Sequence, residues 1–153
     1  KKGHGFIYAM QSLDTGRIGV GAQSLGIAQA AYEKALAYSK TRVQWGSPIT
    51  KLQAIQFKFA DMATRIEATN WLVYHAAYLR DNDKPFVKEA SMAKVFSSEM
   101  ATYVTHQAMQ IMGGYGYMKE YDVERYYRDA RITEIYEGTS EIQRHVIASL
   151  VIK

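Results

Sequence analysis

The chain has 153 residues, of which 48% are hydrophobic and none is cysteine, and its formal net charge is +4. This balance is typical of one globular domain and excludes a disordered chain, which has fewer hydrophobic residues and a larger net charge. The lack of cysteine excludes a disulfide framework, a thiolate metal site and a cysteine nucleophile. The basic residues are scattered, which argues against a nucleic-acid partner, and no apolar run is long enough to predict a membrane span.

The first residues differ in composition from those that follow. Residues 6–10, Phe-Ile-Tyr-Ala-Met, have the composition of a β-strand, but a lone strand needs partners that the rest of the sequence does not supply. The chain also begins without methionine. We therefore expect the chain to be part of a longer protein, with a residual β-strand left from a sheet whose other strands are absent.

Proline residues divide the rest of the chain into long segments of helical composition. The segments are residues 14–40, 50–82 and 85–112, with Pro48 and Pro85 between them. Asp14 is the candidate N-cap of the first segment, and Gly113 would end the third. The second segment has hydrophobic residues at helical spacing, which predicts one buried face. These residues are Leu52, Ile55, Phe59, Met62, Ile66 and Val73.

Two shorter helices are expected after residue 112. One covers residues 122–129, and a last one begins after Gly138, where Thr139 or Ser140 can cap it. The predicted fold is therefore all-α, a four-helix up-down bundle with an extra short helix, preceded by the residual strand.

Two common kinds of helical-bundle or hydrolase chemistry are not supported. A carboxylate-bridged di-metal site needs Glu-x-x-His pairs, and no histidine follows a glutamate at that spacing, so no metal site is predicted. His75 and His106 are interpreted as structural residues. No G-x-S-x-G motif indicates a serine hydrolase.

Two glycine-containing stretches remain as candidate sites. Residues 113–116, Gly-Gly-Tyr-Gly, could bind a phosphate through their backbone N–H groups or simply end the preceding helix, and both interpretations can hold together. Glu137 lies on the turn before the last helix, between Tyr136 and Gly138. Its carboxylate is either an ordinary loop acid or a general base beside an apolar cleft.

Residues 135–144, Ile-Tyr-Glu-Gly-Thr-Ser-Glu-Ile-Gln-Arg, resemble the signature of acyl-CoA dehydrogenases. Three further segments follow the order and spacing of that family: residues 13–17, residues 42–46 with Gln53, and residues 110–116. The resemblance is strongest to the short-chain, butyryl-CoA type. It implies that residues 12–153 are the C-terminal helical domain and residues 1–11 the tail of a missing middle β domain.

The resemblance also implies a catalytic role for Glu137. In the family, the matching residue removes the α-proton of an acyl-CoA thioester while the β-hydrogen leaves as hydride to FAD, and its backbone N–H polarises the thioester carbonyl. Long-chain and isovaleryl relatives carry their base at the position of Gly16, so Glu137 is favoured here. The matching acyl-CoA contacts are Asp14, Thr15, Gly16, Arg17 and Gly138.

For FAD, the resemblance implies two groups of contacts. The group that reaches the FAD of a neighbouring subunit is Arg42, Gln53, Gln110, Ile111, Met112, Gly113 and Gly114. The group within one subunit is Thr139, Ser140 and Glu141, the last of which departs from the Gln of some relatives. Trp45 matches an aromatic residue near the cofactor, although a core or interface tryptophan is an open alternative.

The resulting hypothesis is an FAD-dependent acyl-CoA dehydrogenase that desaturates short-chain acyl-CoA and passes electrons to electron-transfer flavoprotein. The resemblance implies a homo-oligomer, a dimer or tetramer, in the bacterial cytoplasm or mitochondrial matrix. One alternative is an acyl-CoA oxidase, in which oxygen reoxidises the flavin. The other is a non-catalytic helical association module, which is inactive as an isolated fragment because the β domain that holds the flavin is missing.

Overall fold

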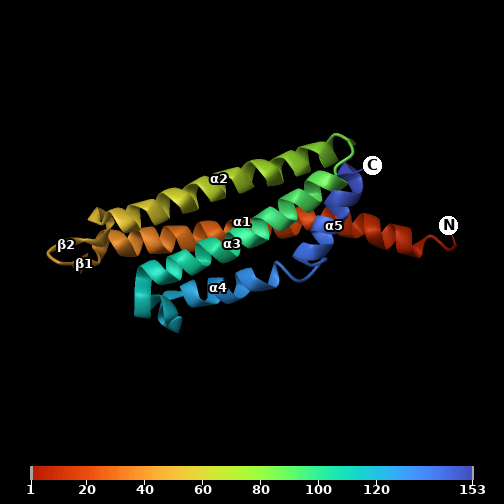
Figure 1. Cartoon of the computed structure of the whole chain (residues 1–153). Coiled ribbons are helices and arrows are strands. Elements are labelled where there is room, and N and C mark those ends of the chain that lie inside the picture. Colours follow the sequence, from red (N-terminus) through yellow and green to blue (C-terminus); the bar gives the residue numbers. More distant parts are fainter. Residues whose placement is uncertain (1, 153) are drawn as a thin grey trace.

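The computed structural model describes residues 2–152 and confirms the all-α prediction. Figure 1 shows helices that alternate in direction along the length of one bundle. In the described part of the chain the helices are α1 (Gly5–Thr41), α2 (Gln53–Asp81), α3 (Val87–Met112), α4 (Val123–Ile132) and α5 (Ser140–Val151). None of these helices is long and apolar enough to cross a membrane.

Helices α1, α2 and α3 form the long part of the bundle. The two shorter helices, α4 and α5, together occupy the place of the fourth helix. Helix α4 packs along α3 and α1, whereas α5 packs on α3 nearer the N-terminal end of that helix (Figure 1). The connection between α4 and α5 therefore lies over the middle of the bundle surface, where it can meet side chains from both α1 and α3.

Small residues let the two central helices approach closely. Ala28, Ala31 and Ala35 of α1 are fully buried in the same cluster as Ala101 and Ala108 of α3. Alanine leaves room for the facing helix and has the highest helix propensity. Larger side chains fill the space toward α2. Most of the hydrophobic residues predicted to form the buried face of residues 52–73 lie in the core or pack against it. The buried ones are Phe59, Met62 and Val73.

The predicted strand at residues 6–10 is wrong, because these residues form the first turns of α1. No proline or glycine interrupts residues 6–13, so nothing stops the helix from extending toward the N-terminus. Asp14 consequently lies inside α1 and is not its N-cap, and it pairs with Arg17 instead. The assignment of residues 1–11 to another domain stays a prediction, and α1 continues without a break from residue 11 to residue 12.

The connection from α1 to α2 contains a small hairpin that the sequence analysis did not predict. Strands β1 (Val43–Gln44) and β2 (Ser47–Pro48) pair antiparallel around Trp45 and Gly46, which have φ values of 47° and 80°. The 3₁₀ turn Ile49–Lys51 then leads into α2. At the end of α3, Gly113 (φ 60°) is the C-cap, as predicted, and two 3₁₀ turns, Gly113–Tyr117 and Lys119–Tyr121, lead to α4.

Candidate functional site

The loop between α4 and α5 carries Glu137 in an unusual backbone conformation. Glu137 and Gly138 have φ values of 52° and 97°, and a non-glycine residue in this region costs about 1–3 kcal/mol. The Ser140 N–H closes the loop by donating to the Glu134 carbonyl oxygen at 3.1 Å. Such a conformation persists only where the surroundings hold it.

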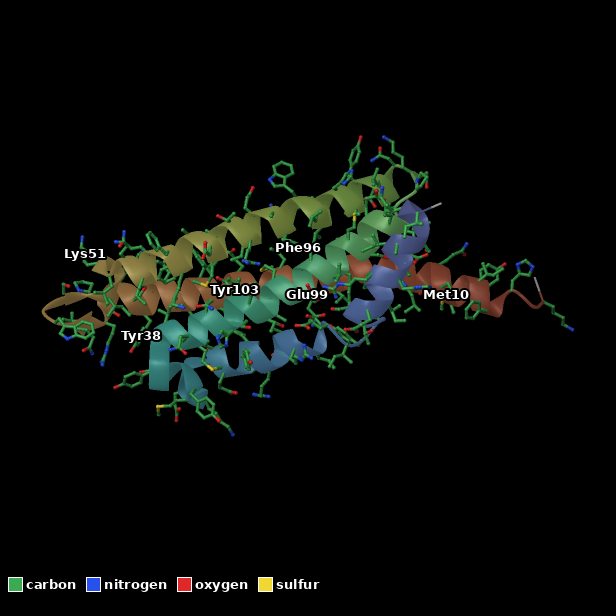
Figure 2. The ribbon with its side chains drawn as sticks, in the orientation of Figure 1. Met10, Tyr38, Lys51, Phe96, Glu99 and Tyr103 are labelled. Atoms are coloured by element: carbon green, nitrogen blue, oxygen red, sulfur yellow. The ribbon has the colours of Figure 1, made fainter. Side chains whose placement is uncertain are left out.

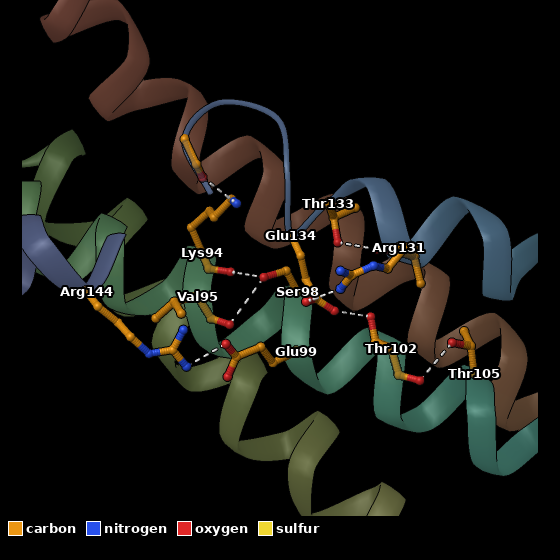
Figure 3. A network of polar contacts seen from close by, with 12 residues as sticks. Lys94, Val95, Ser98, Glu99, Thr102, Thr105, Arg131, Thr133, Glu134 and Arg144 are labelled. Atoms are coloured by element: carbon orange, nitrogen blue, oxygen red, sulfur yellow. Dashed lines mark hydrogen bonds and ion pairs between the residues drawn. The ribbon is translucent and has the colours of Figure 1, made fainter. Parts of the chain in front are cut away.

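Side chains from two helices bind the carbonyl oxygens of this loop. Gln143 of α5 donates from Nε2 to the carbonyl oxygens of Glu137 and Gly138, at 3.3 Å and 3.0 Å. Lys94 of α3 donates from Nζ to the Gly138 carbonyl oxygen at 2.8 Å, and Figure 3 shows this bond reaching across from α3 to the loop. Both Lys94 and Gln143 are fully buried.

The Glu137 carboxylate lies against α1 at Gly16. A Cβ atom added to Gly16 would overlap with Oε2 of Glu137, so only glycine leaves room for the carboxylate in this position. Oε2 is buried and has no hydrogen-bond partner among the described residues. A buried polar atom without a partner needs an explanation, and a catalytic role is one of them.

The turn of α1 next to Glu137 holds a buried ion pair. Arg17 donates to Asp14 at 2.7 Å and to the Ser91 hydroxyl of α3 at 3.3 Å. Arg17 is only 6% exposed, and its Nε has no hydrogen-bond partner in the described structure. Burial raises the pKa of Asp14, and the nearby Arg17 partly opposes this shift. Of the predicted acyl-CoA contacts at residues 14–17, the structure places Gly16 directly against Glu137, and the Asp14–Arg17 pair lies in the same turn of α1.

The start of α5 adds hydrogen-bonding groups to the same region. Thr139 is the N-cap, and its hydroxyl accepts a bond from the Ile142 N–H at 3.4 Å. The Ser140 hydroxyl is buried without a partner among the described residues, at a helix N-terminus where anions bind favourably. The Glu141 side chain is exposed, and hydrogen bonds from its own backbone and from Thr139 lower its pKa.

A second region, at the hairpin end of the bundle, forms an open hollow of about 680 Å³. The hollow is lined by six residues of the predicted FAD set, whereas Gln53 and Gln110 are exposed and are not among its lining residues. The six are Arg42, Trp45, Ile111, Met112, Gly113 and Gly114. Trp45 is 86% exposed at the hairpin tip, so it is not a core residue of this chain.

The residues of this hollow suit a dinucleotide. A Cβ atom at Gly113 or Gly114 would meet open space, so a ligand can approach the backbone there. The Arg42 guanidinium lies 5.6 Å from the ring centre of Tyr115 and can pair with a phosphate. No group of three or more His, Asp or Glu side chains that could hold a metal occurs within residues 2–152.

One chain does not bring the two regions together. Arg17 lies on α1 and Arg42 is the residue that follows its last turn, and 25 residues of helix correspond to about 37 Å. Figure 2 shows Met10 and Tyr38, a residue of the hollow, at opposite ends of the bundle. The two kinds of residues therefore form two separate regions of this chain.

Lys94 and Gln143, which hold the Glu137 loop, were not predicted from the sequence. A signal for Lys94 was present, because it shares a helix face with Ala90, Ala101 and Ser97, which are small residues of the kind that pack between helices. A lysine on such a face is unexpected, since lysine is almost never fully buried without a partner.

Comparisons with known proteins agree with this architecture. Residues 3–152 match the family model for the C-terminal domain of acyl-CoA dehydrogenase. The chain is 63% identical over 151 residues to the mitochondrial short-chain specific acyl-CoA dehydrogenase of Bos taurus, with 99% of this chain and 37% of that protein covered. It therefore spans less than half of the length of this relative.

Solved structures give the same result. The chain is 52% identical to butyryl-CoA dehydrogenase from Megasphaera elsdenii, with a TM-score of 0.99 over 100% of this chain and 40% of that one. It is 54% identical, with a TM-score of 0.98 and the same coverage, to a chain in the structure described as "Electron transferring flavoprotein of Acidaminococcus fermentans". The chain belongs to the acyl-CoA dehydrogenase C-terminal domain family, as its sequence resemblance indicated.

Proposed function

We propose that this chain is the C-terminal domain of an FAD-dependent enzyme that desaturates short-chain acyl-CoA, with Glu137 as the base. The observation that carries the proposal is the half-buried Glu137, whose carboxylate oxygen Oε2 is buried against Gly16 and unsatisfied within residues 2–152. An acyl-CoA thioester bound beside Glu137 can place an α-C–H bond where the carboxylate accepts the proton. The Glu137 carboxyl group then holds the proton that has left the α-carbon.

The chain's own groups can also bind and orient the thioester. The N–H of Glu137 does not occur among the hydrogen bonds found for residues 2–152, so it is available to a thioester carbonyl oxygen. Negative charge builds on that oxygen as the proton leaves, and a fixed donor stabilises it. Arg17 Nε and the Ser140 hydroxyl, also buried without partners there, are further contacts for the substrate or cofactor.

FAD, when bound, would accept the two electrons that leave the β-carbon. Arg42 and the backbone at Gly113 and Gly114 would hold the cofactor of a neighbouring subunit, and the N-terminus of α5 would contact the cofactor of its own subunit. The separation of about 37 Å along α1 between Arg17 and Arg42 favours this division between two subunits.

A homo-oligomer is part of the proposal. Helices α2 and α3 expose an apolar hollow of about 900 Å³ whose aromatic residues are Trp71, Tyr74, Tyr78 and Phe96. Trp71 and Tyr74 are 68% and 66% exposed. A contiguous exposed aromatic surface of this kind marks a protein contact. We assign it to a second copy of the chain, and we assign reoxidation to an electron-transfer flavoprotein in the bacterial cytoplasm or mitochondrial matrix.

The proposal is tested in an assembled enzyme. In this enzyme the chain replaces the matching 40% of Megasphaera elsdenii butyryl-CoA dehydrogenase, and the remainder of that protein supplies the rest. Glu137→Gln keeps the shape of the side chain and removes the base, so kcat with butyryl-CoA should fall by about 10²–10⁴-fold with little change in acyl-CoA binding. A variant that keeps the wild-type kcat would assign the base to another residue.

Two further measurements separate the alternatives. Turnover with electron-transfer flavoprotein in the absence of oxygen distinguishes the dehydrogenase from an oxidase, which needs oxygen as the acceptor. The 153-residue chain alone should self-associate and show neither stoichiometric flavin nor butyryl-CoA turnover. Flavin and turnover in the isolated chain would contradict the need for additional protein.

A further inference from the structure

We propose that Lys94 is a positioning residue that holds the backbone of the Glu137 loop in its reactive conformation. This inference rests on the proposed function for its kinetic consequences and on the structure alone for the loop contact. Lys94 has the largest side chain that is fully buried in the described structure. It forms no ion pair within residues 2–152, and its ammonium group donates to the Gly138 carbonyl oxygen at 2.8 Å.

A fully buried ammonium group is costly unless charges or hydrogen bonds compensate it. Burial lowers the pKa of Lys94, and three carboxylates around it oppose that shift, while Arg17 adds to it. The carboxylates are those of Glu134, Glu137 and Glu141. All three come from the loop or from the first turn of α5, so the negative charge of this segment favours the protonated form of Lys94.

Lys94 contacts Gly138, which lies in the part of the loop with left-handed backbone φ values. Glu137 and Gly138 both have left-handed φ values, and the Gly138 carbonyl oxygen accepts from Lys94 and from Gln143 together. The two donors come from α3 and α5, so they fix the carbonyl direction from two sides. This carbonyl belongs to the peptide plane between Gly138 and Thr139, so fixing it restrains the backbone immediately after Glu137, and Gln143 also binds the Glu137 carbonyl oxygen itself.

The start of the loop is held separately. Glu134 accepts hydrogen bonds from Thr102 of α3 and from Arg131 of α4, as Figure 3 shows. Lys94 therefore acts on the second half of the loop, which carries Glu137, while the first half keeps its own contacts. Its loss should loosen residues 137–139 without releasing the α4 end.

Lys94→Met tests the inference, because methionine fills similar space and donates no hydrogen bond. In the assembled enzyme, kcat with butyryl-CoA should fall by about 10- to 100-fold while KM changes less than about threefold, since a small displacement of a base acts on the chemical step. Thr105→Val, which removes a fully buried hydroxyl of α3 away from the loop, is the matched control and should keep kcat. A wild-type kcat for Lys94→Met, or an equal loss in Thr105→Val, would overturn the inference.

The second readout does not depend on activity. In the 153-residue chain, amide hydrogen exchange at Ser140, whose N–H closes the loop, should become at least about tenfold faster in Lys94→Met relative to the amides of α2. Unchanged relative exchange would overturn the anchoring role whatever the chain catalyses. Faster exchange together with full activity of Glu137→Gln would instead keep the anchor and reject Glu137 as the base.

Gln143→Met provides the test if Lys94→Met does not fold. It removes the other donor to the same carbonyl oxygen and keeps the side-chain volume. It should reproduce the loss of kcat at nearly constant KM, and the double variant should lose less than the product of the two single losses, because both act on one carbonyl. If Gln143→Met keeps both the wild-type kcat and the wild-type exchange rate at Ser140, the proposal that donors to the Gly138 carbonyl oxygen hold the Glu137 loop is contradicted.

Discussion

The two ends of the bundle present functional groups in opposite ways. At the Glu137 end, Gly16, Lys94 and Gln143 enclose the carboxylate and its loop with contacts from three helices. At the hairpin end, Trp45 is 86% exposed and Arg42 lies on an open hollow. The chain thus positions the Glu137 loop with its own side chains, whereas the second group of residues lines an open surface.

This difference indicates where each kind of substitution should act. Changes at the enclosed end alter the position of groups that are already placed, so they should affect the chemical step. Changes at the open end remove contacts that form only when a ligand or second subunit arrives, so they should affect binding. The following substitutions test this division.

Gly16→Ala should have the largest effect. Its Cβ would occupy the space of Glu137 Oε2, so the carboxylate must move, and we expect kcat of the assembled enzyme to fall by about 10²-fold. Gly19→Ala is the matched control on the same helix, because a Cβ there meets nothing within 4 Å and alanine favours the helix. Equal activity of the two variants in a butyryl-CoA assay would show that the carboxylate does not need its place on α1.

Arg42→Gln should weaken flavin binding with a smaller effect than Gly16→Ala has on kcat. Loss of a charge-assisted contact to a phosphate should raise the Kd for FAD by about tenfold, as measured by flavin fluorescence during titration of the assembled apoenzyme. Arg80→Gln, an exposed arginine at the end of α2, is the control and should leave the Kd unchanged. If Arg42→Gln lowers kcat at saturating FAD and leaves the Kd for FAD unchanged, then the assignment of binding effects to the hairpin end is wrong.

Thr139→Ala should change stability modestly at the enclosed end. The Thr139 hydroxyl caps α5, and loss of an N-cap costs about 1 kcal/mol of unfolding free energy. Urea unfolding of the 153-residue chain measures this difference. A cost near zero would mean that the α5 start, and with it the loop, is held without the cap.

The smallest effect concerns pH. Because burial lowers the pKa of Lys94 below 10.5, the unfolded chain binds more protons than the folded chain between the folded pKa and 10.5. The unfolding free energy of the wild type should therefore rise with pH across this window, relative to that of Lys94→Met. Parallel urea titrations at several pH values up to 10.5 measure the difference in unfolding free energy between wild type and Lys94→Met. A difference that falls as the pH rises would contradict the lowered pKa of Lys94.

Most of the fold followed from local signals. Prolines and glycines predicted the ends of α2 and α3, and Thr139 was correctly predicted as a candidate cap of α5. The start of α1 was mispredicted because aromatic and β-branched residues suggested a strand, whereas the helix simply continues through them. The hairpin was missed because two-residue strands carry almost no periodic signal.

The candidate site was predictable in part. The resemblance pointed to Glu137, to residues 14–17 and to the hairpin residues, and the structure places Gly16 of that stretch against Glu137. The small residues that share its helix face were a signal for a buried Lys94, but the loop carbonyl that Lys94 and Gln143 bind becomes apparent only from tertiary packing. The close contact between Gly16 and the Glu137 carboxylate was also not predictable, because it depends on how α1 packs against the loop.

The most direct test of the central claim measures proton transfer at the α-carbon. The assembled enzyme is incubated in deuterium oxide with an acyl-CoA that cannot lose its β-hydrogen, and incorporation of deuterium at the α-carbon is followed by mass spectrometry. Wild-type enzyme should incorporate deuterium, and Glu137→Gln should lose this exchange while it still binds the ligand. Exchange at the wild-type rate in Glu137→Gln would contradict the assignment of Glu137 as the base.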